Sequence, residues 1–321
     1  MGVDPTVGET SGPARTPRAL TAPLVSVVVA AHDAASVIGE CLAALRAQEG
    51  SERAEVVVAD SSTDGTADLI RRLFPETRLL HFDEVLTIAE LRGRGIAAAR
   101  GEIIAILDPF SIADADWLSE LLRAHRDRPN LVIGGAVELH PTQERSLLAW
   151  AAYINEYGMF MPPVKEGETE ILAGSNVSYK RKALFDGARP RYPVFWKTFA
   201  NWEVEAADSR LWLSPKLVVK LKKQVPFLDF LKTRYDHGRC FAGMRVARDA
   251  TWERARRALT APLVPAVLLW RWAAVYWVKR RRRGLFLLTL PLQMALFAVW
   301  SWGELLGYLR GPGPCCARLF Y

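Results

Sequence analysis

Cysteine and histidine are scarce in this chain, which has four cysteines and five histidines among 321 residues. Disulfide scaffolds are denser in paired cysteines, and no Cys/His spacing here matches a structural zinc site. We therefore expect Cys41 and Cys240 to be thiols in a reducing compartment. The adjacent Cys315 and Cys316 follow an apolar segment and are a candidate for lipidation.

Residues 1–22 lack an apolar run of signal-peptide length. They are rich in Pro, Thr, Gly and Ala and contain a single leucine. Because such a composition cannot bury a core, the sequence predicts a flexible cytosolic tail over residues 1–22.

A nucleic-acid-binding surface is not expected, although the net charge is +7. Five of the cations form one run, Lys279–Arg283, which lies between two apolar segments rather than among the aromatics of an open groove. Such a run is typical of a topology signal, or of an anchor to anionic lipid in which each cation contributes ~1 kcal/mol. The same patch would attract a phosphate-bearing lipid.

The chain does contain three β-branched runs that each lead to a carboxylate. Helical periodicity or helix-start signals follow them, so the sequence predicts successive βα units and a parallel sheet. Ligands of open α/β sheets bind beyond the carboxyl ends of the strands, which makes the three carboxylates candidate ligand contacts. Each also fits the common role of Asp in turns. The runs and their carboxylates are Val25–Ala31 with Asp33, Val56–Ala59 with Asp60, and Ile103–Leu107 with Asp108.

Four longer stretches support a more specific interpretation. They occur in the order VSVVVAAHDAASVIGECLAALRAQ, EVVVADSSTDGT, LRGRGIAAARGEIIAILD and AGSNVSYKRKAL. Together they resemble the inverting family 2 glycosyltransferases, over roughly residues 23–245. The resemblance implies an α/β fold of the GT-A type, with a Rossmann-like, mainly parallel sheet flanked by helices. It also implies a nucleotide-diphosphate sugar as donor.

The resemblance places five residues around that donor. It implies that Ala31, Asp33 and Asp60 lie near the base, and that Arg92 lies near the base or the diphosphate. Asp108 is expected near the ribose and the diphosphate. Arg92 also fits a solvated charge on a helix surface, and its spacing alone does not decide between the two.

The residues after Asp108 depart from the family pattern. Family members usually have two aspartates one residue apart here, and the second binds the divalent metal, whereas this chain has Asp108-Pro109-Phe110. Phe cannot coordinate Mg²⁺ or Mn²⁺, because these ions take oxygen ligands. Three possibilities stay open. Asp108 holds the metal with donor oxygens and waters, Arg92 and Arg94 neutralise the diphosphate, or the donor is not turned over.

The resemblance also implies a catalytic base, a carboxylate that takes the proton of the acceptor hydroxyl. In the family it usually belongs to a Glu-Asp pair and keeps a set spacing to a downstream Arg. Glu203 has this spacing to Arg210 and is the predicted base. Glu205 is the second choice, because Val204 replaces the usual Asp. The alternative is a surface helix that carries charged residues.

Two further segments match parts of the family that touch the ligand. Gly174, Ser175 and Asn176 resemble the segment that lines the acceptor and the donor sugar, where small residues let the backbone approach closely. An ordinary strand, with Asn176 satisfied by the backbone, fits equally well. Further along, the family has a segment that can cover the diphosphate, and the resemblance gives this role to Arg234 or Arg239. The alternative is that these residues belong to an amphipathic surface helix.

Two apolar segments follow the predicted GT-A domain of residues 23–250. Residues 251–283 contain Ala261–Val278, which is rich in Trp and carries Arg271 near its centre, and they are predicted to form an interfacial or re-entrant helix with the basic run. Gly284–Gly303 has 20 residues without a charge, and ~20 are needed to span a bilayer core. The sequence therefore predicts a transmembrane or re-entrant helix over 284–310, with a short tail over 311–321.

Two functions of different kinds fit these features. The first is a membrane-associated, inverting, hexosyl-type glycosyltransferase with a cytoplasmic catalytic domain, which moves a single sugar to a lipid or cell-envelope glycan acceptor. Transfer of a single sugar is expected because the Gln-x-x-Arg-Trp signature of the processive synthases is absent. The second is an inactive relative that binds nucleotide sugars or acts as a membrane scaffold, which Phe110 and Val204 motivate.

Overall fold

The computed structural model describes residues 23–319 apart from 208, 224–225 and 248. The tail predicted for residues 1–22 lies outside the described residues.

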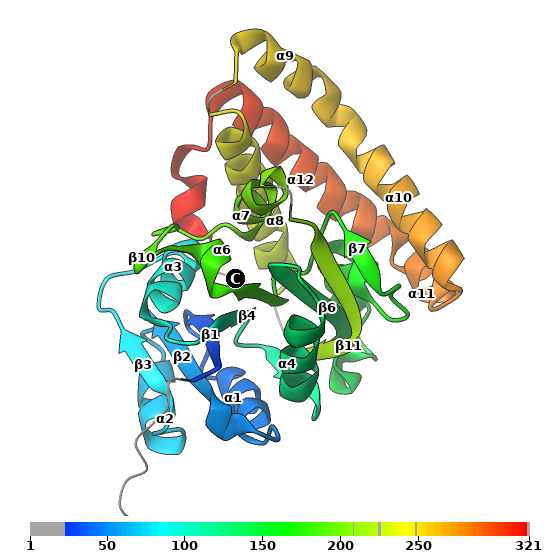
Figure 1. The fold of residues 1–321 in the computed structure, drawn as a ribbon. Coiled ribbons are helices and arrows are strands. Elements are labelled where there is room, and N and C mark those ends of the chain that lie inside the picture. Colours follow the sequence, from blue (N-terminus) through cyan, green and yellow to red (C-terminus); the bar gives the residue numbers. More distant parts are fainter. Residues whose placement is uncertain (1–22, 208, 224–225, 248, 320–321) are drawn as a thin grey trace, which may run out of the picture.

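Within the described residues, nine strands form one mixed sheet in the order β3-β2-β1-β4-β8-β6-β11-β5, with β7 beside β11 (Figure 1). β1 runs parallel to β2 and β4, and β8 runs antiparallel to β4 and β6. The three strands predicted from the sequence are confirmed. The strands of this sheet are β1 Val25–Ala31, β2 Ala54–Asp60, β3 Arg78–His81, β4 Ile103–Leu107, β5 Ser111–Ala113, β6 Val132–Leu139, β7 Gly167–Thr169, β8 Asn176–Lys180 and β11 Leu211–Leu221, and β9 Phe185–Asp186 pairs separately with β10 Arg189–Pro190.

Helices cover both faces of this sheet. All seven residues of β1 are buried. Its apolar side chains alternate between a cluster on one face of the sheet and the clusters on the other face, as expected for a strand that is covered on both sides. One cluster includes side chains of α1, α4 and α5, and the clusters on the other face include side chains of α3, α6 and α7. The helices are α1 Ile38–Arg46, α2 Thr66–Leu73, α3 Ile88–Ala98, α4 Trp117–Asp127, α5 Leu147–Tyr157, α6 Arg181–Leu184, α7 Lys197–Ala206, α8 Phe227–Arg245, α9 Thr251–Thr260, α10 Val264–Lys279, α11 Arg283–Leu288 and α12 Leu290–Arg310.

Asn176 joins the two halves of the sheet. Its side-chain amide donates to the carbonyls of Ala136 in β6 and Leu217 in β11, both at 2.9 Å, and its Oδ1 accepts from the Trp117 indole at 3.0 Å. The side chain is buried, so all three bonds are shielded from water. Gly135 makes room for this arrangement, because a Cβ there would collide with the Leu217 carbonyl and the Asn176 amide.

The transmembrane or re-entrant helix predicted over 284–310 is not one continuous helix in the structure. Thr289 interrupts it between α11 and α12, and Pro291 has no N–H to continue the helical hydrogen bonding. α12 packs along α8, where a Cβ at Gly303 or Gly307 would collide with the backbone of α8. Its polar Gln293 is fully buried and donates to the carbonyl of Ala151 in α5. Part of this segment therefore packs inside the molecule, whereas Leu287, Leu288, Met294 and Trp302 are exposed.

The candidate membrane helix is the segment before α11, Thr251–Lys279. In the part of the chain that the structure describes, one helix is long and apolar enough to cross a membrane, and it is Thr251–Lys279, of 29 residues. Its outward side chains include Trp270, which is 74% exposed, and Leu263, which is 62% exposed. Length and composition alone support a membrane role for it.

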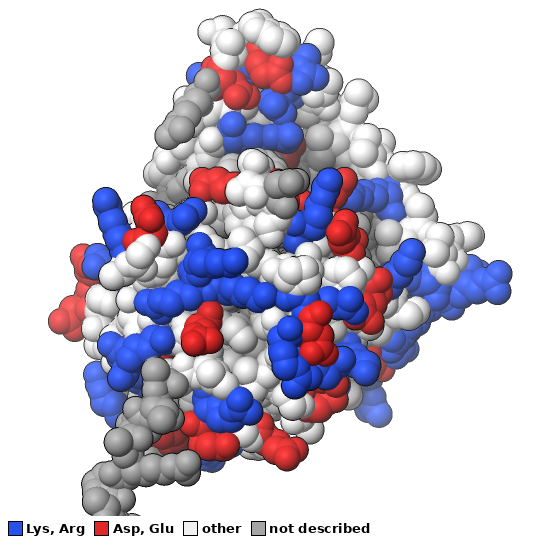
Figure 2. All heavy atoms as spheres, in the orientation of Figure 1, with Lys and Arg blue, Asp and Glu red and all other residues white. Residues whose placement is uncertain are grey.

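The basic run turns the chain from α10 into α11. Figure 2 shows basic side chains gathered at the tip where these two helices meet in Figure 1. Several of the cations also dock on the sheet domain. Lys279 donates to the carbonyl of Met159, Arg281 lies 3.4 Å from the Glu138 carboxylate, and Arg282 lies 3.0 Å from that of Glu144.

The expectation that Cys240 is a free thiol is wrong. Cys240 of α8 forms a disulfide with Cys316, across 76 residues of sequence, whereas Cys41 and Cys315 are free and buried. The pairing arises because the turn Gly313–Arg318 folds back onto α8, where Arg318 also forms an ion pair with Asp236 at 2.7 Å.

Replacing Asn176 with Ala should destabilise the fold by roughly 3 kcal/mol, because the Trp117 indole and two backbone carbonyls lose a buried partner. Urea unfolding of the two proteins, followed by tryptophan fluorescence, measures the difference. Asn130→Ala is the matched control, since Asn130 donates one partly exposed bond to the Arg210 carbonyl. An equal effect of the two substitutions would contradict the role given to Asn176.

Candidate functional site

The three predicted carboxylates do lie beyond the carboxyl ends of β1, β2 and β4. Asp60 is completely buried, and its carboxylate contacts His81 at 2.6 Å and the hydroxyl of Ser62. Asp33 follows β1 and is half exposed. These partners hold Asp60 in place, so Asp33 is the more accessible of the two carboxylates.

The turn around Asp33 has an unusual backbone. Asp33 has a positive φ of 47°, and its carboxylate accepts from the Thr63 N–H at 2.9 Å. Such backbone conformations are uncommon outside glycine and concentrate at functional sites. Ala31, just before this turn, is fully buried, and its carbonyl accepts from the Ser61 N–H at 3.1 Å.

Arg92 and Asp108 form the central ion pair. The Nη2 of Arg92 lies 2.6 Å from Oδ1 of Asp108, and Asp108 is 2% exposed. On the other carboxylate oxygen, Oδ2, the hydroxyl of Tyr157 lies at 3.5 Å. Burial and Asp108 raise the pKa of Tyr157 well above its ordinary value, so the hydroxyl keeps its proton and donates.

The α3 helix that carries Arg92 is held at its start and in its middle. At its start Thr87 and Glu90 form a reciprocal capping box. At Gly93 the helix lies so close to the carbonyl of Pro193 that a Cβ would collide with it. Arg92 is thus positioned by its helix and is not the freely solvated charge that the sequence also allowed.

A cavity of about 130 Å³ opens beside this ion pair. Its wall brings together residues from α3, the end of β4, α5, α8 and the segment after β11. The residues that carry chemistry there are Arg92, Asp108, Glu156, Tyr157, Lys223 and His237. Glu156, Tyr157, Lys223 and His237 were not predicted from the sequence. The one signal for Lys223 was the lysine pair that follows the end of β11.

Glu156 is the second carboxylate of the cavity. It lies 3.2 Å from Nζ of Lys223 and 3.4 Å from Nη1 of Arg234. Burial alone would raise the pKa of Glu156, but Lys223 and Arg234 lower it overall, so this carboxylate stays ionised. Arg234 is itself buried and stacks over the Trp300 ring, 4.2 Å from its centre, so it is not a surface-helix charge. Arg239, in contrast, lies against the carbonyl of Gly311.

Two more titratable groups adjoin the cavity. Burial, together with Arg234, lowers the pKa of His237 to about 3, so its imidazole is neutral at physiological pH. Burial and Arg92 lower the pKa of Lys197 to about 8, while Asp108 opposes the shift. The ammonium of Lys197 donates to the carbonyl of Leu172.

The predicted base candidates lie on α7, away from the cavity wall. Glu203 is exposed and accepts from the hydroxyl of Tyr192 at 2.7 Å. Trp196 lines the cavity. Glu203 follows it by seven residues, about two helical turns, so the two residues lie on the same side of the helix and are separated by ~10 Å along its axis. Glu205 is partly exposed, and Val204 is buried against the sheet.

Of the predicted acceptor segment, Asn176 points into the sheet and fits the ordinary-strand reading. Ser175 is fully buried, and Gly174 precedes them with space around its Cα. Gly174, which is partly exposed, is thus the part of this segment that remains available to a ligand.

The described side chains around Asp108 do not supply the set of ligands that a divalent metal ion needs. In residues 23–319, as far as the structure describes them, no three His, Cys, Asp or Glu side chains gather to hold an ion. Phe110 is buried in the expected ligand position, and both oxygens of Asp108 already face Arg92 and Tyr157. Arg94 is exposed and lies over the Phe82 ring, outside the cavity.

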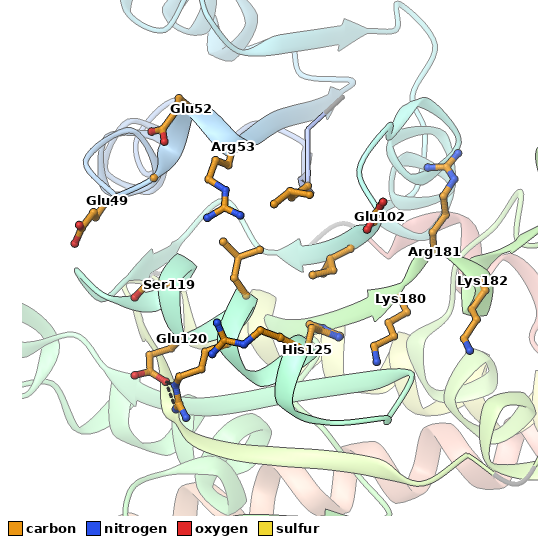
Figure 3. Close-up of a pocket in the computed structure, with 16 residues that line it drawn as sticks. Glu49, Glu52, Arg53, Glu102, Ser119, Glu120, His125, Lys180, Arg181 and Lys182 are labelled. Atoms are coloured by element: carbon orange, nitrogen blue, oxygen red, sulfur yellow. Dashed lines mark hydrogen bonds and ion pairs between the residues drawn. The ribbon is translucent and has the colours of Figure 1, made fainter. Parts of the chain in front are cut away.

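A larger hollow of about 970 Å³ lies elsewhere, at the amino-terminal ends of β1 and β4. Figure 3 shows that Arg53, Glu102, Lys180 and other side chains of both charges line it. Since ligands of such sheets bind at the opposite, carboxyl edge, and none of the predicted site residues reaches this hollow, the smaller cavity is the candidate site.

Comparisons with known proteins agree with the family resemblance of the sequence. Residues 26–186, half of the chain, match the family model described as Glycosyl transferase family 2. The mannosyltransferase PcManGT from Pyrobaculum calidifontis, solved in complex with GDP-Man and Mn²⁺, has a TM-score of 0.51 and 20% identity, and the alignment covers 89% of this chain and 91% of that one. At this identity the likeness shows a shared GT-A fold.

Two curated relatives match over shorter stretches. EpsH of Bacillus subtilis, described as a glycosyltransferase, is 32% identical over 114 residues, which are 35% of this chain and 33% of EpsH. The succinoglycan biosynthesis protein ExoO of Rhizobium meliloti is 37% identical over 101 residues, which are 31% of this chain and 29% of ExoO. The match thus spans about a third of the length of these relatives.

The lowered pKa of Lys197 predicts a pH-dependent stability. In the unfolded chain the amine titrates near ~10.4, whereas in the folded protein it titrates at about 8. Between these values only the unfolded state holds the proton, so this group makes wild-type stability rise with pH, by at most ~1.4 kcal/mol per unit. Lys197→Met should remove that rise, as measured by urea unfolding on both sides of pH 8.

Lys182→Met is the control, because Lys182 is an exposed lysine of α6. It should keep the wild-type slope. Parallel slopes for wild type and Lys197→Met would show that Lys197 does not titrate in this window.

Proposed function

The chain belongs to glycosyl transferase family 2, and on that premise we propose that it moves a single sugar from a nucleotide-diphosphate sugar to a lipid or cell-envelope glycan acceptor. The family is an inverting one, so transfer is a single displacement at the anomeric carbon. The acceptor oxygen attacks from the face opposite the leaving diphosphate.

The observation that carries this proposal is the Arg92–Asp108 pair at the end of β4, beside a cavity with further fixed cations. The edge of the sheet where it lies is the one at which α/β folds bind nucleotides. Asp33 and Asp60 lie at the same edge and are the proposed contacts of the base, together with Ala31, the last residue of β1. Asp108 is the proposed contact of the ribose, and Arg92 that of the diphosphate.

Glu203 is the proposed base. Burial and Glu203 itself raise the pKa of Tyr192, so the Tyr192 hydroxyl keeps its proton and donates to the carboxylate. A carboxylate accepts a proton in its ionised form. Because Glu203 lies beyond the cavity wall, an acceptor that reaches it approaches from the outer side of α7, past Gly174.

The names of two relatives favour a glycan or lipid-linked acceptor. ExoO is named for succinoglycan biosynthesis, and EpsH is a glycosyltransferase by name. Intermediates of cell-envelope glycans are commonly membrane-bound, and the exposed apolar face of α9 and α10 provides a surface that fits a bilayer. Trp270 and Trp277 of this face are side chains that prefer the membrane interface.

We therefore place the enzyme at the cytoplasmic membrane surface, with α10 in the interface and the basic run toward anionic headgroups. Lys279, Arg281 and Arg282 dock on the sheet domain, and Figure 2 shows basic side chains gathered at this tip. The sheet domain is then held beside the bilayer, where a lipid-linked acceptor presents its hydroxyl.

Glu203→Gln should lower sugar transfer by about 100-fold or more, since a positioned general base contributes ~10² to 10⁴. Membranes that contain the protein, supplied with a panel of nucleotide-diphosphate sugars, measure the transfer. The matched control is Glu205→Gln on the same helix, which should keep activity. Loss in Glu205→Gln alone would move the base to Glu205, and full activity in both would contradict a base on α7.

Replacing Trp270 with Glu should weaken binding to vesicles of anionic phospholipid by about tenfold, because an exposed aromatic leaves the interface and a negative charge enters it. Vesicle co-sedimentation measures the bound fraction. The control Val85→Glu alters another exposed apolar residue, in the loop before α3. Equal binding of wild type and Trp270→Glu would contradict the membrane-facing role of α10.

A further inference from the structure

An aromatic ring lies beside the ammonium group of Lys223, a residue that lines the cavity. Phe110 is 4% exposed, and Nζ of Lys223 lies 5.3 Å from the centre of its ring. The backbone sets this arrangement, because β11 pairs with β5 at Leu221 and Ser111, and the N–H of Lys222 then donates to the Phe110 carbonyl at 2.9 Å. The face of an aromatic ring attracts a cation, so Phe110 favours an ammonium beside it.

Lys223 is also held from two other sides. The Glu156 carboxylate lies 3.2 Å from its Nζ, and the centre of the Phe230 ring lies 5.4 Å away. The carbonyl of Lys223 accepts from the Gln143 side chain at 3.0 Å. The side chain therefore has little freedom, and its charge is fixed in the wall that also contains Arg92 and Asp108.

We propose that the ammonium of Lys223, together with Arg92, neutralises the diphosphate of the donor in place of a divalent metal ion. This inference rests on the proposed function, because it concerns the same nucleotide-sugar site. Phe110 has two effects in this arrangement. It removes the oxygen ligand that a metal needs, and its ring supports the lysine that takes over the metal's charge.

The charges around the cavity agree with this role. Among the described residues in and behind the cavity wall, four side chains are basic and two are carboxylates, which leaves an excess of two positive charges while Lys197 is protonated. A nucleotide-diphosphate sugar carries two negative charges on its diphosphate, so the cluster can neutralise it without a further cation. The basic residues are Arg92, Lys197, Lys223 and Arg234, and the carboxylates are Asp108 and Glu156.

A leaving diphosphate needs this neutralisation as its charge develops. A preorganised cation in a site that excludes water supplies it without reorganisation at the moment of reaction. Lys223 meets the condition because its partners Glu156, Phe110 and Phe230 hold the ammonium before any ligand arrives.

Titration calorimetry of the full-length protein with UDP and with GDP tests the proposal, first in EDTA and then with added Mn²⁺ or Mg²⁺. The wild type should bind one of the two nucleotides with affinities that agree within about twofold across these conditions. Lys223→Met should weaken that binding by ~10- to 100-fold, the usual size of a hydrogen bond to a charged group. Added Mn²⁺ should not restore it.

Two variants serve as controls. Lys222→Met removes the neighbouring lysine, whose partner is Glu40 on α1, and should bind like the wild type. Lys223→Arg keeps the positive charge and should retain part of the affinity. Thermal unfolding of each variant by circular dichroism shows whether lost affinity reflects lost structure.

The outcomes distinguish failure of the role proposed for Lys223 from failure of the proposed function. Wild-type binding or sugar transfer that EDTA abolishes and Mn²⁺ or Mg²⁺ restores would overturn the substitution of metal by Lys223 and leave the transferase function standing. Unchanged affinity in Lys223→Met would overturn it as well. No binding of either nucleotide by the wild type, with or without metal, would overturn the proposed function and this inference with it.

Discussion

The ion pair between Arg92 and Asp108 connects the parts of the molecule that form the candidate site. Asp108 ends β4 in the middle of the sheet, and Arg92 projects from α3, whose start is capped and whose close packing depends on Gly93. Tyr157 of α5 reaches the same carboxylate from the other side. Because the pair is buried, loss of either partner leaves an uncompensated charge, which is far more costly than a missing surface pair.

Around this pair the chain has gathered more basic than acidic side chains. Glu156 keeps Lys223 and Arg234 in place, and burial keeps His237 neutral, so the positive charge sits on groups with defined positions. The helices that follow the sheet contribute directly, since Arg234 belongs to α8 and is buried between Glu156 and Trp300. α12, packed along α8, is thus part of the support of the site.

The sequence predicted the features that depend on local pattern. β-branched runs gave β1, β2 and β4 because such runs fit buried parallel strands, and the carboxylates after them lie at one edge as expected. It did not predict Glu156 and Lys223, which are 67 residues apart and meet only after folding. The same holds for Cys240 and Cys316. For 284–310 the sequence did not show the break at Thr289 or the packing of α12 along α8, because a helix that packs inside a protein and one that crosses a bilayer have similar composition.

The most direct test is a crystal structure of the full chain with UDP or GDP and Mn²⁺ in the crystallisation drop. The diphosphate should lie between Arg92 and Lys223, beside Asp108, with no anomalous signal of manganese next to Phe110. A nucleotide in the larger hollow lined by Arg53 and Lys180, or a manganese ion bound by Asp108 and the diphosphate, would contradict this arrangement.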